Sequence, residues 1–330
     1  MKALILGVTG MVGSHLLDHL LEHTDWDIVG ACRWRSPLDN VDHIIGDDRV
    51  TFDYADINDF GSLMILFNKH KPDYVFHLAA QSYPQDSFKM VSSTLQTNVI
   101  GTANVLETIK QLELDPVIHV CSSSEVFGRV PKEFVPIDEE VKYHPASPYA
   151  ISKVGTDMLG RYYAEAYGMK TLTTRMFTHT GPRRGDVFAE STFAKQIALI
   201  EAGKQAPIVY VGNLNSMRTW ADVRDAVNAY HILVTSNPVY GEYYNIGGDY
   251  SCTIGGMLDT LLAFSTMGNV IDVVVDKERL RPIDADLQIP NTTKFKTHTG
   301  WQPTYTFEQT MEDLLNYWRE RVVTNNFLNR

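Results

Sequence analysis

The chain has 330 residues, of which 44% are apolar and 21% charged, a composition typical of a globular protein. It contains no run of about 20 apolar residues, so no membrane span is expected, and the net charge of −11 argues against nucleic acid or an anionic membrane as a partner. The three cysteines are widely spaced, and a strand is expected from residue 2 with no signal peptide before it, which together predict a cytoplasmic protein with reduced thiols.

The first predicted element is a buried parallel strand over Lys2–Gly7, a short apolar run. The glycine turn Gly-Val-Thr-Gly-Met-Val-Gly follows, and Ser14–His23 is expected to be a helix. Such a turn brings the backbone close to a pyrophosphate, and the helix N-terminus supplies free N–H groups. The spacing is G-x-x-G-x-x-G rather than G-x-G-x-x-G, and an ordinary strand-to-helix turn is the alternative. We predict a dinucleotide site formed by Gly7, Thr9, Gly10, Met11, Val12 and Gly13.

The same helix carries His15, His19 and His23 at positions i, i+4 and i+8. Two helical histidines can bind zinc, but no glutamate follows His15 as it does in a metalloprotease helix, and no acidic shell is evident. We therefore interpret these histidines as a solvated helix face and predict no metal site.

The second predicted strand, Asp27–Cys32, leads into Arg33-Trp-Arg35-Ser36. An NAD enzyme usually carries an acidic residue here that holds the ribose 2′-hydroxyl. Two guanidinium groups and a hydroxyl instead suit a 2′-phosphate, through bidentate charge-assisted hydrogen bonds. This favours NADP over NAD, the alternative being a basic loop that makes no contact with a cofactor.

Strands and helices alternate as far as residue 176. Further strands are predicted over 50–53, 74–80, 117–121 and 171–177, with helices between them. This alternation predicts an α/β fold with a doubly wound parallel (Rossmann) sheet. Ligands of such sheets bind beyond the carboxyl ends of the strands. The glycine turn, Ala79-Ala80, Ser123 and the residues after 177 should therefore converge on one crevice.

A helix carrying Tyr149 and Lys153 is expected to start at Ser147 and Pro148 and to end near Gly168. Positions i and i+4 lie on one helix face. An ammonium group beside a phenol lowers the pKa of the phenol, which could then exchange a proton with a substrate hydroxyl near neutral pH. The alternative is an exposed tyrosine and a solvated lysine.

After residue 177, prolines divide the chain into short segments. This predicts a smaller, irregular α/β domain that caps the crevice. The expected division is a cofactor-binding domain over 1–177 and a second domain mainly over 178–330, with a helix over 219–235 returning to the first.

The motifs Gly7-x-x-Gly10-x-x-Gly13, Ser123 and Tyr149-x-x-x-Lys153 together resemble the extended short-chain dehydrogenase/reductase family. Within it, the chain is most similar to the GDP-mannose 4,6-dehydratases, above all in the loop His-Thr-Gly-Pro-Arg-Arg-Gly that ends at Gly185. Segments such as Phe-Ala-Lys-Gln-Ile, ending at Ile197, look more like the related GDP-4-keto-6-deoxymannose reductases.

This resemblance implies a role for each matching residue. Tyr149 would take the proton of the sugar 4-hydroxyl, Lys153 would hold the nicotinamide ribose and lower the pKa of the tyrosine, and Ser123 would hydrogen-bond the developing ketone. Glu125 would remove the C5 proton. His179 and Arg184 would contact NADP, the arginine within its own subunit or across a subunit interface. The cofactor would also contact Arg33, Arg35, Ser36, Asp56, Ile57, Leu78, Ala79, Ala80 and Ser82, and the substrate would contact Ser82, Ser124, Thr178, Lys195, Arg218 and Arg281.

Two positions depart from the pattern of this dehydratase group. Ser123 stands where threonine is usual, which keeps the hydroxyl but loses the rotamer restriction. Thr178 stands where asparagine is usual and touches the substrate in the family, so it bears on the sugar preference.

The resemblance implies a nucleotide-sugar 4,6-dehydratase that converts GDP-mannose to GDP-4-keto-6-deoxymannose with internal hydride recycling. A homodimer or homotetramer that uses NADP is expected. The alternatives are a GDP-4-keto-6-deoxymannose reductase, another nucleotide-sugar epimerase or dehydratase of the family, and a non-catalytic dinucleotide sensor. Sensors of this fold typically lack the tyrosine or the lysine, and both are present here.

Overall fold

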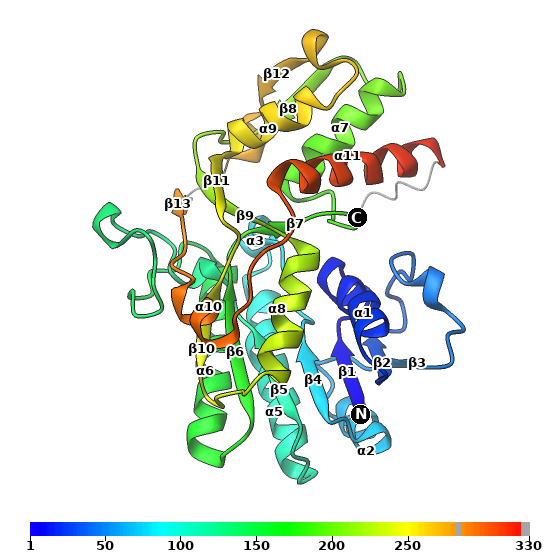
Figure 1. Ribbon diagram of the computed structural model, residues 1–330, viewed down its shortest axis with the longest axis vertical. Coiled ribbons are helices and arrows are strands. Elements are labelled where there is room, and N and C mark those ends of the chain that lie inside the picture. Colours follow the sequence, from blue (N-terminus) through cyan, green and yellow to red (C-terminus); the bar gives the residue numbers. More distant parts are fainter. Residues whose placement is uncertain (281–284, 325–330) are drawn as a thin grey trace.

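The computed structural model describes residues 1–280 and 285–324, and its largest part is a parallel sheet of seven strands (Figure 1). The strand order is β10-β6-β5-β4-β1-β2-β3, so the order reverses between β1 and β4. The strands are β1 (Lys2–Leu6), β2 (Asp27–Cys32), β3 (Val50–Tyr54), β4 (Tyr74–His77), β5 (Val117–Cys121), β6 (Thr171–Met176) and β10 (Tyr243–Ile246). The predicted doubly wound α/β fold is confirmed.

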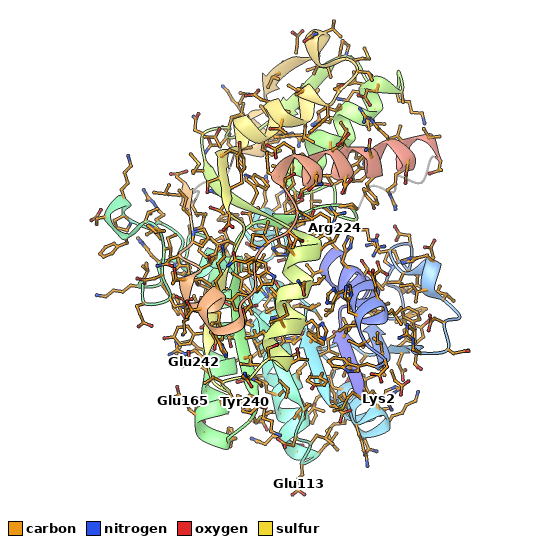
Figure 2. The ribbon with its side chains drawn as sticks, in the orientation of Figure 1. Lys2, Glu113, Glu165, Arg224, Tyr240 and Glu242 are labelled. Carbon is orange, nitrogen blue, oxygen red and sulfur yellow. The ribbon has the colours of Figure 1, made fainter. Side chains whose placement is uncertain are left out.

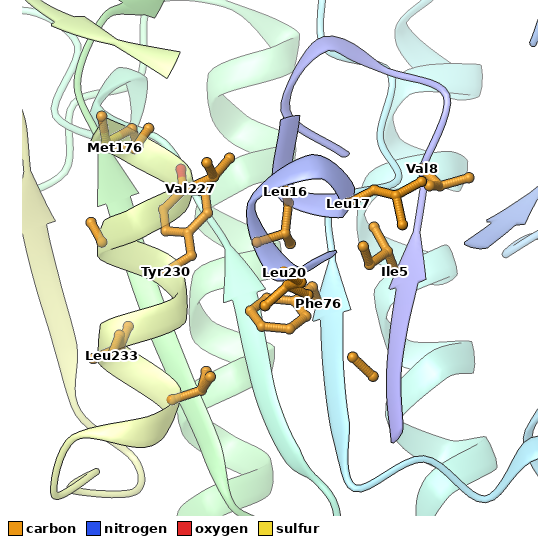
Figure 3. Packing of buried hydrophobic residues seen from close by; sticks show 14 of the residues in the cluster. Ile5, Val8, Leu16, Leu17, Leu20, Phe76, Met176, Val227, Tyr230 and Leu233 are labelled. Atoms are coloured by element: carbon orange, nitrogen blue, oxygen red, sulfur yellow. The ribbon is translucent and has the colours of Figure 1, made fainter. Parts of the chain in front are cut away.

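Helices cover both faces of this sheet. On one face, Leu16 and Leu20 of α1 and Tyr230 of α8 belong to the same apolar cluster as Phe76 of β4 (Figure 3). On the other face, a second cluster around Phe67 joins α2, α5 and α6 to the sheet. No helix in the described ranges is long and apolar enough to span a membrane. The helices are α1 (Met11–His23), α2 (Phe60–His70), α4 (Val91–Leu95), α5 (Gly101–Gln111), α6 (Pro148–Tyr167) and α8 (Val223–Thr235), with a π-helical turn over Gln96–Ile100 between α4 and α5.

The rest of the chain forms a smaller part with its own apolar core, which includes Phe193, Leu258 and Trp318. It contains a two-stranded parallel sheet and a second small sheet in which β7 and β11 flank β9. Whether the chain divides at residue 177 stays a prediction, although β10 of the later half is a strand of the large sheet and α8 and α10 pack against that sheet. The short helix α3 (Pro84–Ser87) contacts α6, and α10 (Thr293–Thr299) contacts β10. The elements of the smaller part are β7 (His179–Thr180), α7 (Ala189–Glu201), β8 (Ile208–Val211), β9 (Met217–Asp222), β11 (Tyr250–Thr253), α9 (Ile254–Ala263), β12 (Asp272–Val275), β13 (Leu287–Gln288) and α11 (Phe307–Val323).

The predicted start of the returning helix at residue 219 is wrong. Residues 217–222 form strand β9, in which Trp220 and Ala221 are buried. The helix α8 begins at Val223, because the Asp222 carboxylate accepts the backbone N–H of Arg224 at 2.8 Å and caps the first turn. The strand runs directly into the helix without a turn, so Asp222, the capping residue, marks the boundary in the sequence.

The interpretation of the histidines as a solvated face is wrong for His15 and His19, whereas His23 is exposed. His15 is 9% exposed, and its Nε2 lies 3.0 Å from the carbonyl oxygen of Pro182. His19 Nε2 lies 3.1 Å from Nδ1 of His231 on α8, so this face of α1 packs against the smaller part and α8. Burial lowers the pKa of His15 and of His19 to about 4, which keeps both rings neutral at pH 7.

Arg224 joins the two parts of the molecule, at the N-terminal end of α8 (Figure 2). Its guanidinium donates to Asp222 and, at 2.7 Å, to Asp313 of α11, and it stacks on Tyr305 with 3.8 Å between the guanidinium carbon and the ring centroid. The helix that packs on the large sheet is thereby bonded to the last helix of the smaller part.

A buried ion pair anchors α6 to the sheet. Arg175 of β6 donates from Nε and Nη2 to both oxygens of Asp157 at 2.8 and 3.0 Å, and Nη1 donates to the Glu139 carbonyl at 2.8 Å. Tyr143 also donates to Asp157 at 2.8 Å. Both side chains of the pair are almost fully buried, at 1% and 0% exposed. Because Asp157 lies one helix turn beyond Lys153, this pair fixes the height and rotation of the helix that carries the predicted catalytic residues.

We predict that Asp157→Ala lowers the free energy of unfolding by about 3–5 kcal/mol, because it leaves the Arg175 charge buried and unpaired. Urea denaturation followed by circular dichroism measures the change. Asp249→Ala is the matched control: it breaks the pair with Lys296, in which the aspartate is 61% exposed, and should cost less than about 1 kcal/mol. Equal losses in the two variants would contradict the anchoring role.

Candidate active site

A cavity of about 990 Å³ opens at the carboxyl ends of the large sheet, between the sheet and the smaller part. The structure brings nearly all of the predicted site residues together around it. Arg35 and Lys195 do not line it, and Arg281 lies outside the described residues. The predicted residues that do line it are Gly7, Thr9, Gly10, Met11, Val12, Gly13, Arg33, Ser36, Asp56, Ile57, Leu78, Ala79, Ala80, Ser82, Ser123, Ser124, Glu125, Tyr149, Lys153, Thr178, His179, Arg184 and Arg218.

The glycine turn forms a shallow cradle at one end of the cavity. Gly7 has φ of +90°, and a Cβ there would lie 2.9 Å from the backbone of Ala79. A Cβ on Gly13 would lie 2.3 Å from the carbonyl oxygen of Gly7, so neither position accepts a side chain without a backbone shift. Gly10 caps α1 without a side chain, which leaves the first N–H groups of the helix to bind an anion. The cradle has the form that a dinucleotide pyrophosphate requires.

The basic segment after β2 lies at the edge of the same cavity. Arg33 and Ser36 line it, and the Arg33 side chain is exposed. The guanidinium carbon of Arg35 instead stacks 4.4 Å from the ring centroid of Trp34. Of the two predicted arginines, Arg33 therefore lines the cavity together with Ser36, and Arg35 does not.

Tyr149 lies in the cavity wall and is 8% exposed, which rules out the alternative of an exposed tyrosine. Ser123 lines the same wall, and its Oγ accepts the backbone N–H of Glu125 at 3.2 Å. Burial raises the pKa of Tyr149 above its ordinary value, and the Ser123 side chain and the charge of Arg184 act against this rise. The phenol, the serine hydroxyl and a carboxylate thus share one corner of the cavity.

Lys153 lies on the same face of α6 as Tyr149, and its lowering of the tyrosine pKa stays a prediction. The Lys153 ammonium donates to the carbonyl oxygen of Cys121 at 2.7 Å and lies 6.0 Å from the centroid of the Tyr149 ring. Lys153 is only 5% exposed, and this burial lowers its own pKa. The spacing i, i+4 correctly predicted a shared helix face, but the lysine bonds the end of β5 rather than the phenol.

The loop after β7 supplies a second group of polar residues. His179 Nδ1 lies 3.1 Å from the carbonyl oxygen of Phe177, and burial, together with the charge of Arg184, lowers the pKa of His179 to about 4. Arg183 has φ of +67° and donates to Asp18 of α1 at 2.6 Å. The Arg184 guanidinium bonds Glu190 at 2.9 Å. Both arginines line the cavity, as a site for an anionic ligand requires.

Sequence reasoning missed much of the cavity wall on the side of the smaller part. The backbone of Gln81 is held by the Asn98 side chain at 2.8 and 2.9 Å. Most of the other missed residues come from loops and helix ends that have no periodicity to reveal them. The missed lining residues include Tyr83, Gln85, Phe188, Glu190, Asn213, Ser216, Glu278 and Arg279.

Comparison with known proteins finds similarity along nearly the whole chain. The sequence model of the family described as GDP-mannose 4,6 dehydratase matches residues 4–314. A GDP-6-deoxy-D-mannose reductase of Pseudomonas aeruginosa is 29% identical over 97% of this chain and 98% of its own length. GDP-mannose 4,6 dehydratase 1 of Arabidopsis thaliana is 29% identical over 98% of this chain and 92% of its own. The solved structure of RMD from P. aeruginosa complexed with NADPH has a TM-score of 0.82 at 29% identity, covering 97% of this chain and 100% of the other.

We predict that Arg33→Ala weakens the binding of NADP⁺ roughly tenfold and leaves that of NAD⁺ nearly unchanged, because one charge-assisted hydrogen bond to a 2′-phosphate is worth about 1.5–3 kcal/mol. Calorimetric titration with each dinucleotide measures both affinities. Arg35→Ala, at an arginine that does not line the cavity, is the matched control. Equal weakening of both dinucleotides in Arg33→Ala would remove the argument for a 2′-phosphate.

Proposed function

Since the chain belongs to the GDP-mannose 4,6-dehydratase family of extended short-chain dehydrogenases/reductases, we propose that it is an NADP-dependent 4,6-dehydratase that converts GDP-mannose to GDP-4-keto-6-deoxymannose. This family contains nucleotide-sugar dehydratases and related reductases, and the chain is an enzyme of the family. The choice of sugar, of nucleotide base and of reaction within the family is the proposal.

Three features of the cavity support a nicotinamide dinucleotide as the cofactor. The cradle of Gly7 and Gly13 leaves no room for a Cβ, the N-terminus of α1 faces the cavity, and Arg33 and Ser36, which line the cavity, would bind a ribose phosphate. The P. aeruginosa structure with NADPH, at 29% identity, supports the phosphorylated form. When bound, the nicotinamide accepts a hydride from the sugar and later returns it.

The residues at the corner of Tyr149 supply the remaining chemistry. Tyr149 takes the proton of the 4-hydroxyl as the C4–H bond breaks, and Ser123 donates a hydrogen bond to the developing carbonyl oxygen. The carbonyl acidifies the C5 hydrogen, which Glu125 removes. The protonated Glu125 then gives its proton to the 6-hydroxyl, which leaves as water and leaves a double bond between C5 and C6. The hydride taken from C4 would return to C6, and a proton equivalent to the one that Tyr149 took from the 4-hydroxyl would add to C5, which gives the 4-keto-6-deoxy sugar. Arg218, 8% exposed in the cavity wall, carries the charge that would pair with the nucleotide diphosphate.

The observation that carries the dehydratase proposal is the presence of Glu125 in the same corner as the Tyr149–Ser123 pair. Reduction of a ketone needs a hydride and one proton donor, whereas elimination of water also needs a base at C5 and an acid at C6. A carboxylate can act first as the base at C5 and then, once protonated, as the acid at C6. The loop with Arg183 and Arg184, which resembles the dehydratases, adds to this argument.

Reduction of a 4-keto-6-deoxy sugar is the second candidate. The P. aeruginosa reductase is as similar to this chain, at 29%, as the A. thaliana dehydratase. The segment that ends at Ile197 also resembles the reductases. Assembly into a homodimer or homotetramer stays a prediction.

Incubation of the purified chain with GDP-mannose and NADP⁺ tests the proposal. We expect a product lighter by one water molecule in the mass spectrum, formed without accumulation of NADPH. Unchanged GDP-mannose, with consumption of NADPH when the 4-keto sugar is supplied, would establish the reductase instead. A parallel screen of CDP-, dTDP- and UDP-sugars tests the nucleotide base, and no reaction with any substrate would leave a non-catalytic sensor.

We predict that Glu125→Gln slows the loss of water 10²–10⁴-fold, the usual contribution of a positioned acid–base group. The first oxidation at C4 should persist, and it is observed as a transient rise in NADPH absorbance in a single turnover. Glu133→Gln, at an exposed glutamate of the following loop, is the matched control and should react like the unmodified chain. Full dehydration by Glu125→Gln would show that its assigned role is wrong.

A further inference from the structure

The turn that carries Arg33 and Ser36 is exposed, but the chain on either side of it is buried. Cys32, the last residue of β2, is 5% exposed, and Val41 is fully buried in the apolar cluster of α1. Between them, the Ser36 N–H donates to the Arg33 carbonyl at 2.8 Å, and residues 33–35 are exposed. Because an exposed turn has few packing contacts of its own, its position depends on how its two ends are held.

Asn40 holds the far end of this segment against the phosphate cradle. It is 3% exposed, and its Nδ2 donates to the carbonyl oxygen of Thr9 at 2.9 Å. Thr9 lies in the glycine turn and lines the cavity. The cradle is common to NAD and NADP, since both dinucleotides carry the pyrophosphate. The bond from Asn40 should therefore matter equally for the two cofactors.

Asp39, the preceding residue, is bonded to the last helix of the smaller part. Arg321 Nη2 donates to Asp39 Oδ2 at 2.9 Å, and the two side chains are 13% and 17% exposed. Arg321 lies in the last turn of α11. Val322, beside it, is fully buried, and Nε1 of Trp318, one turn earlier, donates to Ser191 at 2.8 Å. The guanidinium is therefore carried by a helix that is packed into the core of the smaller part.

This ion pair joins the two parts of the molecule close to the expected cofactor contacts. Asp39 lies three residues after Ser36 and six after Arg33, which both line the cavity. Asp39, Asn40 and Arg321 do not line it, so their effect on a bound dinucleotide passes through neighbours that do. Hydrogen bonds between a guanidinium and a phosphate are directional, and a displaced turn would weaken them.

We propose that Asp39 and Arg321 are positioning residues for the cofactor: they hold the turn with Arg33 and Ser36 in place, so the last helix of the smaller part sets the preference for NADP over NAD. The inference deepens the proposed function and rests on it for the role of Arg33 and Ser36 at a 2′-phosphate. NAD lacks this phosphate, so its affinity should depend little on the position of the turn.

Calorimetric titration with NADP⁺ and NAD⁺ tests the proposal. Arg321→Met should raise the Kd for NADP⁺ about fivefold and that for NAD⁺ less than about twofold, and Arg321→Lys, which keeps the charge, should restore most of the difference. Arg319→Met is the matched control, because the same helix carries Arg319 and its ion pair with Glu201 lies within the smaller part. An unchanged ratio of the two Kd values in Arg321→Met would reduce the pair to a structural bond and overturn the proposal.

Variants of the loop separate the two anchors. Asp39→Asn breaks the same ion pair from the loop side and should change the ratio as Arg321→Met does, which keeps the test decisive should the helix variant fold poorly. The double variant should be no worse than either single one, because both remove one bond. Asn40→Ala should instead weaken both dinucleotides by similar factors. Equal weakening of the two cofactors in Asp39→Asn would contradict its role in selectivity and overturn the proposal.

Hydrogen exchange separates this inference from the proposed function. An unmodified chain that binds NAD⁺ as tightly as NADP⁺ would refute the proposed cofactor preference. The anchoring is then decided in the cofactor-free protein, by the amides of Ser36 and Val41, which donate to carbonyl oxygens within the segment. These amides should exchange about fivefold faster in Arg321→Met than in the unmodified chain or in Arg319→Met. Unchanged exchange would show that the ion pair does not hold the turn.

Discussion

The site depends on one column of buried polar side chains along α6. Tyr149, Lys153 and Asp157 follow one another at intervals of four residues, and all three are buried. A buried polar group is costly unless it is hydrogen-bonded. Lys153 meets the carbonyl at Cys121 on β5, and Asp157 meets Arg175 on β6. Because both bonds must form together, they set the helix against the sheet, and the phenol consequently faces the cavity at the ends of the strands.

The Tyr-x-x-x-Lys pattern suggested that the lysine acts directly on the phenol, but in the structure the two side chains have different partners. The lysine ammonium is bonded to the backbone, 6.0 Å from the phenol ring, so its main structural effect is on the end of β5. Burial alone makes Tyr149 a weaker acid. The loop that carries Arg184, on the smaller part of the chain, forms another wall of the same cavity. The walls of the cavity therefore come from both parts of the fold.

Much of this architecture could be predicted from the sequence, because the signals were local. Ser147 and Gly168 marked the two ends of α6, and the glycine turn marked the start of α1. What failed depended on contacts between distant segments. Nothing in the local sequence around His15 and His19 indicates that distant segments of the chain pack on them. The cavity wall of the smaller part comes from loops and from the first turn of α7, which carries Glu190, and this wall forms only when the smaller part packs on the sheet.

Two bonds between α1 and the loop after β7 affect what each catalytic cycle costs in conformational entropy. His15 bonds the Pro182 carbonyl at 3.0 Å, and Arg183 bonds Asp18 at 2.6 Å, so two successive residues of the loop are fastened to the helix that bears the phosphate cradle. The loop cannot rotate independently of that helix. The walls that receive the two ligands are therefore aligned during folding, and the entropic cost of aligning them does not recur in each turnover.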